Sequence, residues 1–211
     1  MKMNMDMDLV NRRNGLFALA CIVTMAIVYE PMRYLLFSSS HGEYYSHIIM
    51  IPFVSAFLIY LSRKEIFKDR IYSVKQGIPV ILMGVIVYLL GRYFKVQLVD
   101  NDYVSTIALS AVIFINGAFI LFYGVRTFKA ALFPLLFLFF VIPIPSLLMD
   151  RIIYSLQVGS TEFVNILLMA TGVPFLREGF AFHLPSMSVE VAKQCSGIRS
   201  CLALFITALL A

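Results

Sequence analysis

Five apolar stretches, each about as long as a membrane-crossing helix, constrain this chain more than any other feature. A helix needs roughly 20 apolar residues to cross the hydrocarbon core of a bilayer. Hydrophobic residues make up 61% of the chain and charged residues only 14%, a composition that a soluble domain cannot bury. The sequence therefore predicts an all-α fold, a polytopic bundle of transmembrane helices. The five stretches are residues 16–37, 44–61, 78–94, 104–123 and 130–149.

Basic residues gather in a few short segments between these stretches. They lie in the loop after the second stretch, in the link at residues 126–129, and at Arg12 and Arg13 before the first stretch. Because lysine and arginine are enriched in cytoplasmic loops, we expect these segments inside the cell and the fifth stretch to emerge outside near Pro143 and Pro145. The net charge of +5 then reflects topology, and we expect membrane lipids rather than nucleic acid as the surroundings.

Residues 151–171 allow two readings. The segment is apolar enough to span, but Gln157, Thr161 and Asn165 follow one another at four-residue spacing and so share one helix face. It is either a sixth span whose polar stripe packs against other helices, or an amphipathic helix lying in the membrane interface. The choice decides which side of the membrane the following residues face.

The chain becomes too polar to span after Gly172 and Pro174. Residues 173–191 alternate in polarity and predict a short extracytoplasmic hairpin, with a turn near residues 185–187. From Ser196 the chain is apolar again up to Ala211, shorter than a full span. We therefore expect one transmembrane domain over residues 1–211, incomplete at its C-terminal end.

Cys195 lies where this polar segment meets the last apolar helix. Unpaired N–H groups and the helix dipole at such a start lower a thiol pKa from about 8.5 and favour a nucleophilic thiolate. Lys193 and Arg199 add positive charge, and Gly197 allows close approach of a substrate backbone. The plainer alternative is that Cys195 is a small apolar residue at a helix start and Arg199 an interfacial anchor.

The other two cysteines suggest no further chemistry. Cys21 and Cys201 lie inside apolar stretches, so the three cysteines form neither a disulfide framework nor a zinc-binding spacing. We expect no metal and no cofactor.

Several motifs together resemble the exosortase and archaeosortase family of membrane enzymes. Residues 195–200, Cys-Ser-Gly-Ile-Arg-Ser, are similar to that family's nucleophile motif. Tyr45-Ser46-His47 resembles its early Tyr-Ser-His signature, which is usually followed by glycine where this chain has Ile48. Further matching motifs occur in the expected order: Pro143-Ile144-Pro145, Leu156-Gln157, Ser160-Thr161, Gly172-Val173-Pro174, Arg177-Glu178-Gly179 and Val189-Glu190-Val191.

The resemblance implies a cysteine protease or transpeptidase of the inner (plasma) membrane. Cys195 would be the catalytic nucleophile at the extracytoplasmic face, attacking exported precursor proteins that carry a C-terminal sorting signal of the PEP-CTERM type. The family also uses an arginine and a histidine on later spans, and neither occurs in this chain at those positions. Because general acid–base help contributes about 10²- to 10⁴-fold, we expect the fragment to be inactive or nearly so. The supporting motif residues are Ser196, Gly197, Arg199 and Ser200.

Three further residues are candidates for a substrate groove: His47, His183 and Arg177. His47 is otherwise explained as a helix-capping residue, and His183 as an interfacial hydrogen-bonding residue. An extracytoplasmic Cys195 requires residues 151–171 to lie in the interface or re-enter, so we prefer that placement. The rival hypothesis is a non-enzymatic polytopic protein, either a transporter-like bundle or an assembly factor for surface polysaccharide export; the paired broken helices of transporters are not evident.

Overall fold

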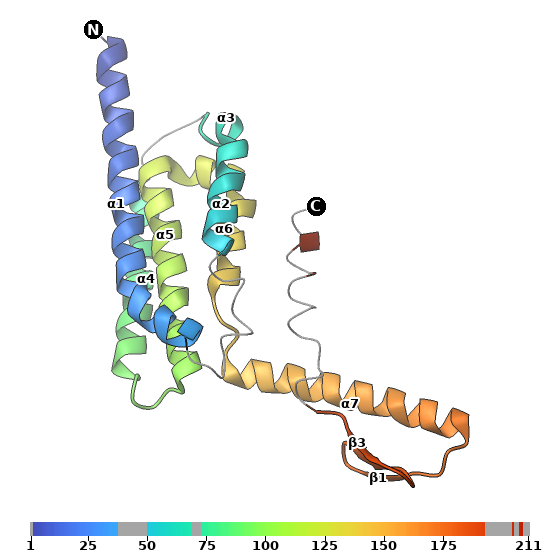
Figure 1. The fold of residues 1–211 in the computed structure, drawn as a ribbon. Helices are drawn as coiled ribbons and strands as arrows, with labels where there is room; N and C mark the ends of the chain where they lie inside the picture. The colour runs from blue at the N-terminus through green and yellow to red at the C-terminus, as the bar shows by residue number, and fades with distance from the viewer. Residues whose placement is uncertain (1, 38–49, 69–72, 193–203, 205–206, 209–211) are drawn as a thin grey trace. The chain divides into compact units, whose positions relative to one another are not determined.

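The fold is that of a computed structural model, which describes residues 2–37, 50–68, 73–192, 204 and 207–208 (Figure 1). The chain divides into two compact units, Met1–Ile144 and Pro145–Ala211. The single domain expected over residues 1–211 stays a prediction.

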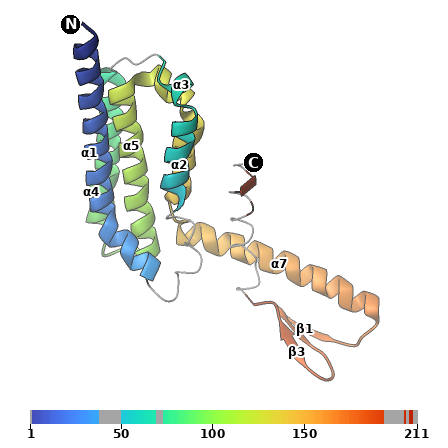
Figure 2. The ribbon, with the colours of Figure 1, turned by 45° about the horizontal axis from the view of Figure 1, so that its top comes forward.

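The first unit is built from helices. Helix α5 packs against α4 and α1, and the short helix α2 packs against α6 and η1 (Figures 1 and 2). The helices are α1 (Lys2–Phe37), α2 (Met50–Leu61), α3 (Arg63–Ile66), α4 (Val74–Tyr93), α5 (Asp100–Ala130), α6 (Leu132–Phe137) and the 3-10 helix η1 (Leu138–Val141).

Among the described residues, 4 helices are long and apolar enough to cross a membrane. These are Arg12–Pro31, Val74–Tyr93, Asp100–Ala130 and Ser146–Thr171. The predicted polytopic helical membrane fold is therefore confirmed.

Two of the five predicted spans look different in the structure. The described part of the second is the 12-residue helix α2. The fifth, residues 130–149, is not one helix: α6 and η1 are followed by a non-helical segment at residues 142–145, and α7 begins at Ser146. The backbone becomes extended at Ile142, so the interruption predicted at the prolines is confirmed. An earlier interruption lies inside α5 at Gly124, where φ is 87°.

Glycines bring α4 and α5 close together. Gly77, Gly84 and Gly91 recur every seven residues of α4 and are buried. A Cβ added at Gly77 would lie 2.7 Å from the Cα of Leu121, and one added at Gly84 would lie 3.0 Å from the backbone nitrogen of Phe114. Only glycine permits this approach, which gains van der Waals contact between the two backbones.

Aromatic side chains fill the other face of α5. Phe119 and Tyr123 are buried, and Phe17 of α1 packs edge-on against both rings, at centroid distances of 5.7 and 5.3 Å. The Tyr123 hydroxyl donates a hydrogen bond of 2.9 Å to Asn14 Oδ1. This cluster joins α1 to α5 near the basic N-terminal segment.

The Pro143–Pro145 segment is held by α5. Asn101 Nδ2 donates to the carbonyl of Ile144 at 2.9 Å, and Ser105 Oγ donates to the carbonyl of Pro143 at 2.8 Å. These side chains satisfy carbonyls that a continuous helix would have paired internally. The interrupted backbone is thus satisfied by protein contacts.

The second unit combines one helix with a small sheet. Helix α7 (Ser146–Thr171) ends at Gly172, whose φ of 72° is the left-handed conformation that commonly terminates helices. Three antiparallel strands follow in the order β1-β2-β3. They are β1 (Leu176–Glu178), β2 (Ala181–His183) and β3 (Ser188–Glu190).

The predicted hairpin is confirmed as β2 and β3. Its turn closes with a hydrogen bond of 2.8 Å from the Leu184 N–H to the Met187 carbonyl. The structure adds β1, which pairs with β2 through a turn at Gly179, where φ is 61°. The sequence analysis placed one turn, near residues 185–187, and therefore predicted two strands and not this third one.

Candidate functional site

The structure divides the sequence-predicted site residues into two groups. Arg177 and His183 lie in the sheet of the second unit. The remaining candidates lie outside the described residues, so their roles stay predictions: Cys195, Ser196, Gly197, Arg199, Ser200 and His47. The described part of the site is therefore the support that precedes the cysteine motif.

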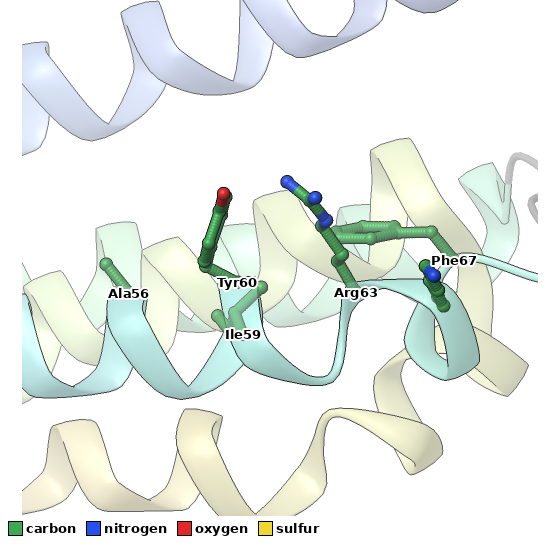
Figure 3. A pocket seen from close by; sticks show the side chains of 6 residues that line it. Ala56, Ile59, Tyr60, Arg63 and Phe67 are labelled. Atoms are coloured by element: carbon green, nitrogen blue, oxygen red, sulfur yellow. The ribbon is translucent and has the colours of Figure 1, made fainter.

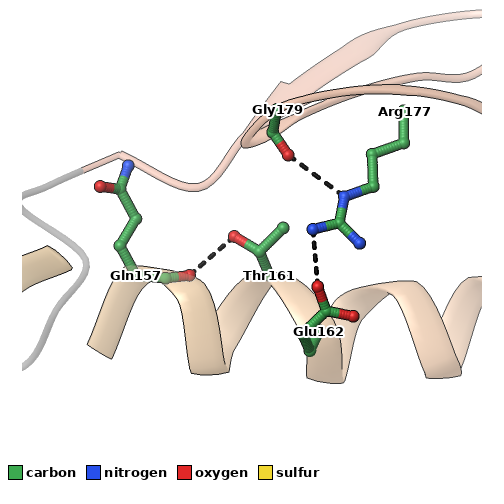
Figure 4. A network of polar contacts seen from close by, with 5 residues as sticks. All are labelled: Gln157, Thr161, Glu162, Arg177 and Gly179. Atoms are coloured by element: carbon green, nitrogen blue, oxygen red, sulfur yellow. Dashed lines mark hydrogen bonds and ion pairs between the residues drawn. The ribbon is translucent and has the colours of Figure 1, made fainter. Parts of the chain in front are cut away.

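The polar stripe of α7 faces the sheet. Gln157 and Thr161 are the buried residues of this helix, 5% and 0% exposed, although both side chains are polar. Thr161 Oγ1 donates to the carbonyl of Gln157 at 2.7 Å, as a threonine inside a helix commonly does (Figure 4). The stripe that the sequence assigned to helix packing or to the interface thus contacts the sheet that follows it.

Gln157 fixes the chain just before the cysteine motif. Its Nε2 donates a hydrogen bond of 2.6 Å to the carbonyl of Val191, directly after β3. Val191 also donates its N–H to the Phe180 carbonyl at 3.0 Å. Val191 precedes Cys195 by four residues, so its two hydrogen bonds hold the backbone in place shortly before the cysteine motif.

Arg177 ties the sheet to α7. Its Nη2 donates to Glu162 Oε1 at 2.7 Å and its Nε donates to the Gly179 carbonyl at 3.2 Å (Figure 4). The hydrogen bond to Glu162 raises the pKa of Arg177. Because these two partners bind its guanidinium, Arg177 links the sheet to α7. Its role in a substrate groove stays a prediction.

Phe182 is the apolar centre of the unit. It is 0% exposed, with the Phe175 ring 5.7 Å from its own centroid and the Arg177 guanidinium carbon 5.9 Å from it. Tyr154 of α7 meets Phe180 edge-on at 5.9 Å. Aromatic packing therefore adds to the hydrogen bonds that join α7 and the sheet.

His183 contacts its neighbours in the sheet. Its Nδ1 lies 2.8 Å from Ser188 Oγ on β3, and its Nε2 lies 3.6 Å from Glu178 Oε2 on β1. Both ring nitrogens are thus near partners within the sheet, and the side chain is 42% exposed. This arrangement suits the hydrogen-bonding role, while a role in the groove stays a prediction.

Sequence reasoning missed two residues of this unit. Glu162 stands next to the polar stripe, and its opposite charge to Arg177 was the available signal for a pair. Phe182 is an ordinary apolar residue of the hairpin, and nothing in the sequence distinguishes it from Phe180. Only the packing of sheet on helix decides which phenylalanine is buried.

A separate hollow lies in the first unit where α2 meets α3. It has a volume of about 470 Å³. Its lining, shown in Figure 3, consists of Ala56, Ile59, Tyr60, Arg63, Lys64 and Phe67.

In the described parts of the chain, no group of three His, Cys, Asp or Glu side chains is placed to hold a metal ion.

The long apolar helices define a polytopic membrane protein, and its second unit carries one small antiparallel sheet. A family model described as transmembrane exosortase (Exosortase_EpsH) matches residues 38–211. This chain belongs to the transmembrane exosortase family. Searches of curated proteins and of solved structures returned no match.

Proposed function

We propose that this chain is the cysteine-bearing part of an exosortase that cleaves exported precursor proteins at a C-terminal sorting signal of the PEP-CTERM type. Cys195 acts as the nucleophile at the outer face of the inner membrane. The family match over residues 38–211, which includes the whole cysteine motif, carries the proposal. The same match favours the enzyme over the transporter-like or assembly-factor alternative.

Helix α7 lies in the membrane interface in this proposal. Its 26 residues measure about 39 Å, enough to cross, but Glu162 is then roughly 9 Å inside a hydrocarbon core about 30 Å thick. The Glu162–Arg177 pair and the two open sheet edges, β1 and β3, would enter the core with it. Unpaired strand edges in contact with lipid cost several kcal/mol per unsatisfied group, which favours the interface.

In this proposal the chain that leads to Cys195 lies at the membrane surface. A substrate whose signal contains a hydrophobic helix presents its cleavage motif at this level. The cysteine attacks the substrate carbonyl, the peptide bond breaks as the leaving amine takes a proton, and the thioester passes to a second nucleophile. Among the described residues, His183 lies near Ser188 and Glu178 within the sheet, and the family resemblance implies that a histidine on a later span donates the proton.

Thiol labelling in right-side-out membrane vesicles tests the proposal. The chain carries Cys21→Ala and Cys201→Ala, which leave Cys195 as its one cysteine, and the reagent is a membrane-impermeant maleimide. We expect labelling before permeabilisation, with an apparent pKa below about 8.5. Adding Cys195→Ala should abolish the signal.

A second cysteine controls the sidedness. Lys68→Cys, placed in the basic segment of the same background with Cys195→Ala, should be labelled only after permeabilisation. Labelling of Cys195 that follows the Lys68→Cys pattern would place the motif in the cytoplasm and overturn the proposal.

The family resemblance, with its arginine and histidine on later spans, also predicts the activity of residues 1–211. With a precursor carrying a C-terminal signal, this chain should process about 10²- to 10⁴-fold less than a form extended by spans that carry the arginine and histidine. Equal processing by both forms would show that the acid–base group lies within residues 1–211.

A further inference from the structure

The hollow at the end of α2 combines an apolar wall with two cations. Ala56 and Ile59 lie on the apolar helix, whereas Arg63 and Lys64 begin α3, just past the helix end at Leu61. Its volume of about 470 Å³ falls within the range of small-molecule sites. A ligand that fits this arrangement has an apolar tail and an anionic head.

The cations are placed to receive an anion. The Arg63 guanidinium carbon lies 4.2 Å from the centre of the Tyr60 ring, and Figure 3 shows both side chains projecting from the same side. Stacking on an aromatic ring orients a guanidinium while leaving its N–H groups able to bind phosphate. Among the described carboxylates, Glu65 follows the two cations in α3, but the ion pairs at Glu162 and Glu178 involve neither Arg63 nor Lys64.

The hollow is apolar where α2 lines it and charged just past the end of α2. Helix α2 carries no charged residue from Met50 to Leu61, and the first charge, Arg63, appears two residues after it ends. Tyr60 is 58% exposed at this boundary, where tyrosines commonly anchor helices at the headgroup level. A helix end of this polarity suits a position with its cations at the depth of lipid phosphates and its apolar wall at the depth of acyl chains.

We propose that this hollow binds one anionic phospholipid, whose phosphate pairs with Arg63 and Lys64 and whose acyl chain lies along Ala56 and Ile59. The site belongs to the first unit and does not depend on the reaction of Cys195. Basic pockets at the ends of membrane helices bind anionic headgroups in this manner.

Native mass spectrometry of the whole chain, released from detergent with added phosphatidylglycerol, tests the site. The variant Arg63→Gln/Lys64→Gln should bind the lipid about 30-fold more weakly, which corresponds to about 1 kcal/mol for each basic residue. The matched control is Arg126→Gln/Lys129→Gln, which removes the same two charges from exposed positions outside the hollow. This control should bind like the unmodified chain.

Two further measurements separate the ligand sources. Phosphatidylcholine should bind weakly to all variants, and inorganic phosphate should compete poorly because it cannot occupy the apolar wall. Ala56→Phe keeps both charges but fills the hollow from an exposed position, and it should also lose phosphatidylglycerol. Equal loss in the Arg126/Lys129 control, unchanged binding in the Arg63/Lys64 or Ala56 variants, or full competition by phosphate would overturn the proposal.

Discussion

Helices α4 and α5 meet through glycines, whereas α7 meets its sheet through polar side chains. In the first pair, Gly77 and Gly84 let two backbones come within van der Waals contact. In the second, Gln157 and Glu162 reach across to Val191 and Arg177 by hydrogen bonds of 2.6 and 2.7 Å. Both contacts are specific, but the first is specified by shape and the second by matched donors and acceptors.

The difference follows from the solvent around each contact. Two apolar helices in lipid gain little from hiding apolar surface, so close packing of small residues decides their association. A sheet with open edges needs water or the interface, where burial of Phe182 and directional hydrogen bonds stabilise it. The two kinds of contact are those expected of a helix pair in lipid and, in the proposed function, of a sheet at the membrane surface.

Removal of the Phe182 ring should have the largest effect on this comparison. Phe182→Ala empties the centre of the sheet and should destabilise the second unit by about 3 kcal/mol, since deleting a buried phenylalanine leaves a cavity. Hydrogen exchange of the β2 amides reports the loss. Phe163→Ala, which changes a side chain 63% exposed on α7, is the control and should leave β2 protection nearly unchanged. Similar loss in both variants would mean that Phe182 is not the centre of the sheet.

A methyl group at the α4–α5 contact should have the next largest effect. Gly77→Ala places a Cβ against the Leu121 backbone and should destabilise the pair by about 2 kcal/mol, despite the better helix propensity of alanine. Thermal unfolding in detergent measures this. Gly159→Ala in α7 meets no atom within 4 Å and should be neutral or stabilising. A change in stability of the same sign in both variants would contradict close packing of the α4 and α5 backbones as the cause.

The hydrogen bond from Gln157 should have the smallest effect of the three. Gln157→Leu leaves the Val191 carbonyl without this donor and should cost about 1 kcal/mol. It should also change the rate of Cys195 labelling, because the chain is no longer held four residues before the motif. Asn165→Leu, four residues further than Thr161 on the same helix, is the matched control. A labelling rate equal in Gln157→Leu, Asn165→Leu and the unmodified chain would remove Gln157 from the positioning of the motif.

Sequence reasoning reached the class of fold and the family, because both depend on local patterns. Apolar stretches of bilayer length identify membrane helices without knowledge of their neighbours, and the prolines at Pro143 and Pro145 stop a helix wherever they occur. The motifs around Cys195 likewise lie within short segments. The hairpin turn near residues 185–187 followed from local turn chemistry and was found where expected.

The tertiary structure decided what local patterns leave open. Residues 130–149 are apolar enough for a span, yet they form two short helices, with Ser55 Oγ of α2 donating to the Pro134 carbonyl at 2.7 Å. The polar stripe at Gln157 and Thr161 was visible in the sequence, but its partner, a three-stranded sheet, was not. Composition and periodicity determine which helix and strand faces must be buried. Only the tertiary structure determines what they pack against, because hydrogen-bond partners and close backbone contacts join residues far apart in sequence.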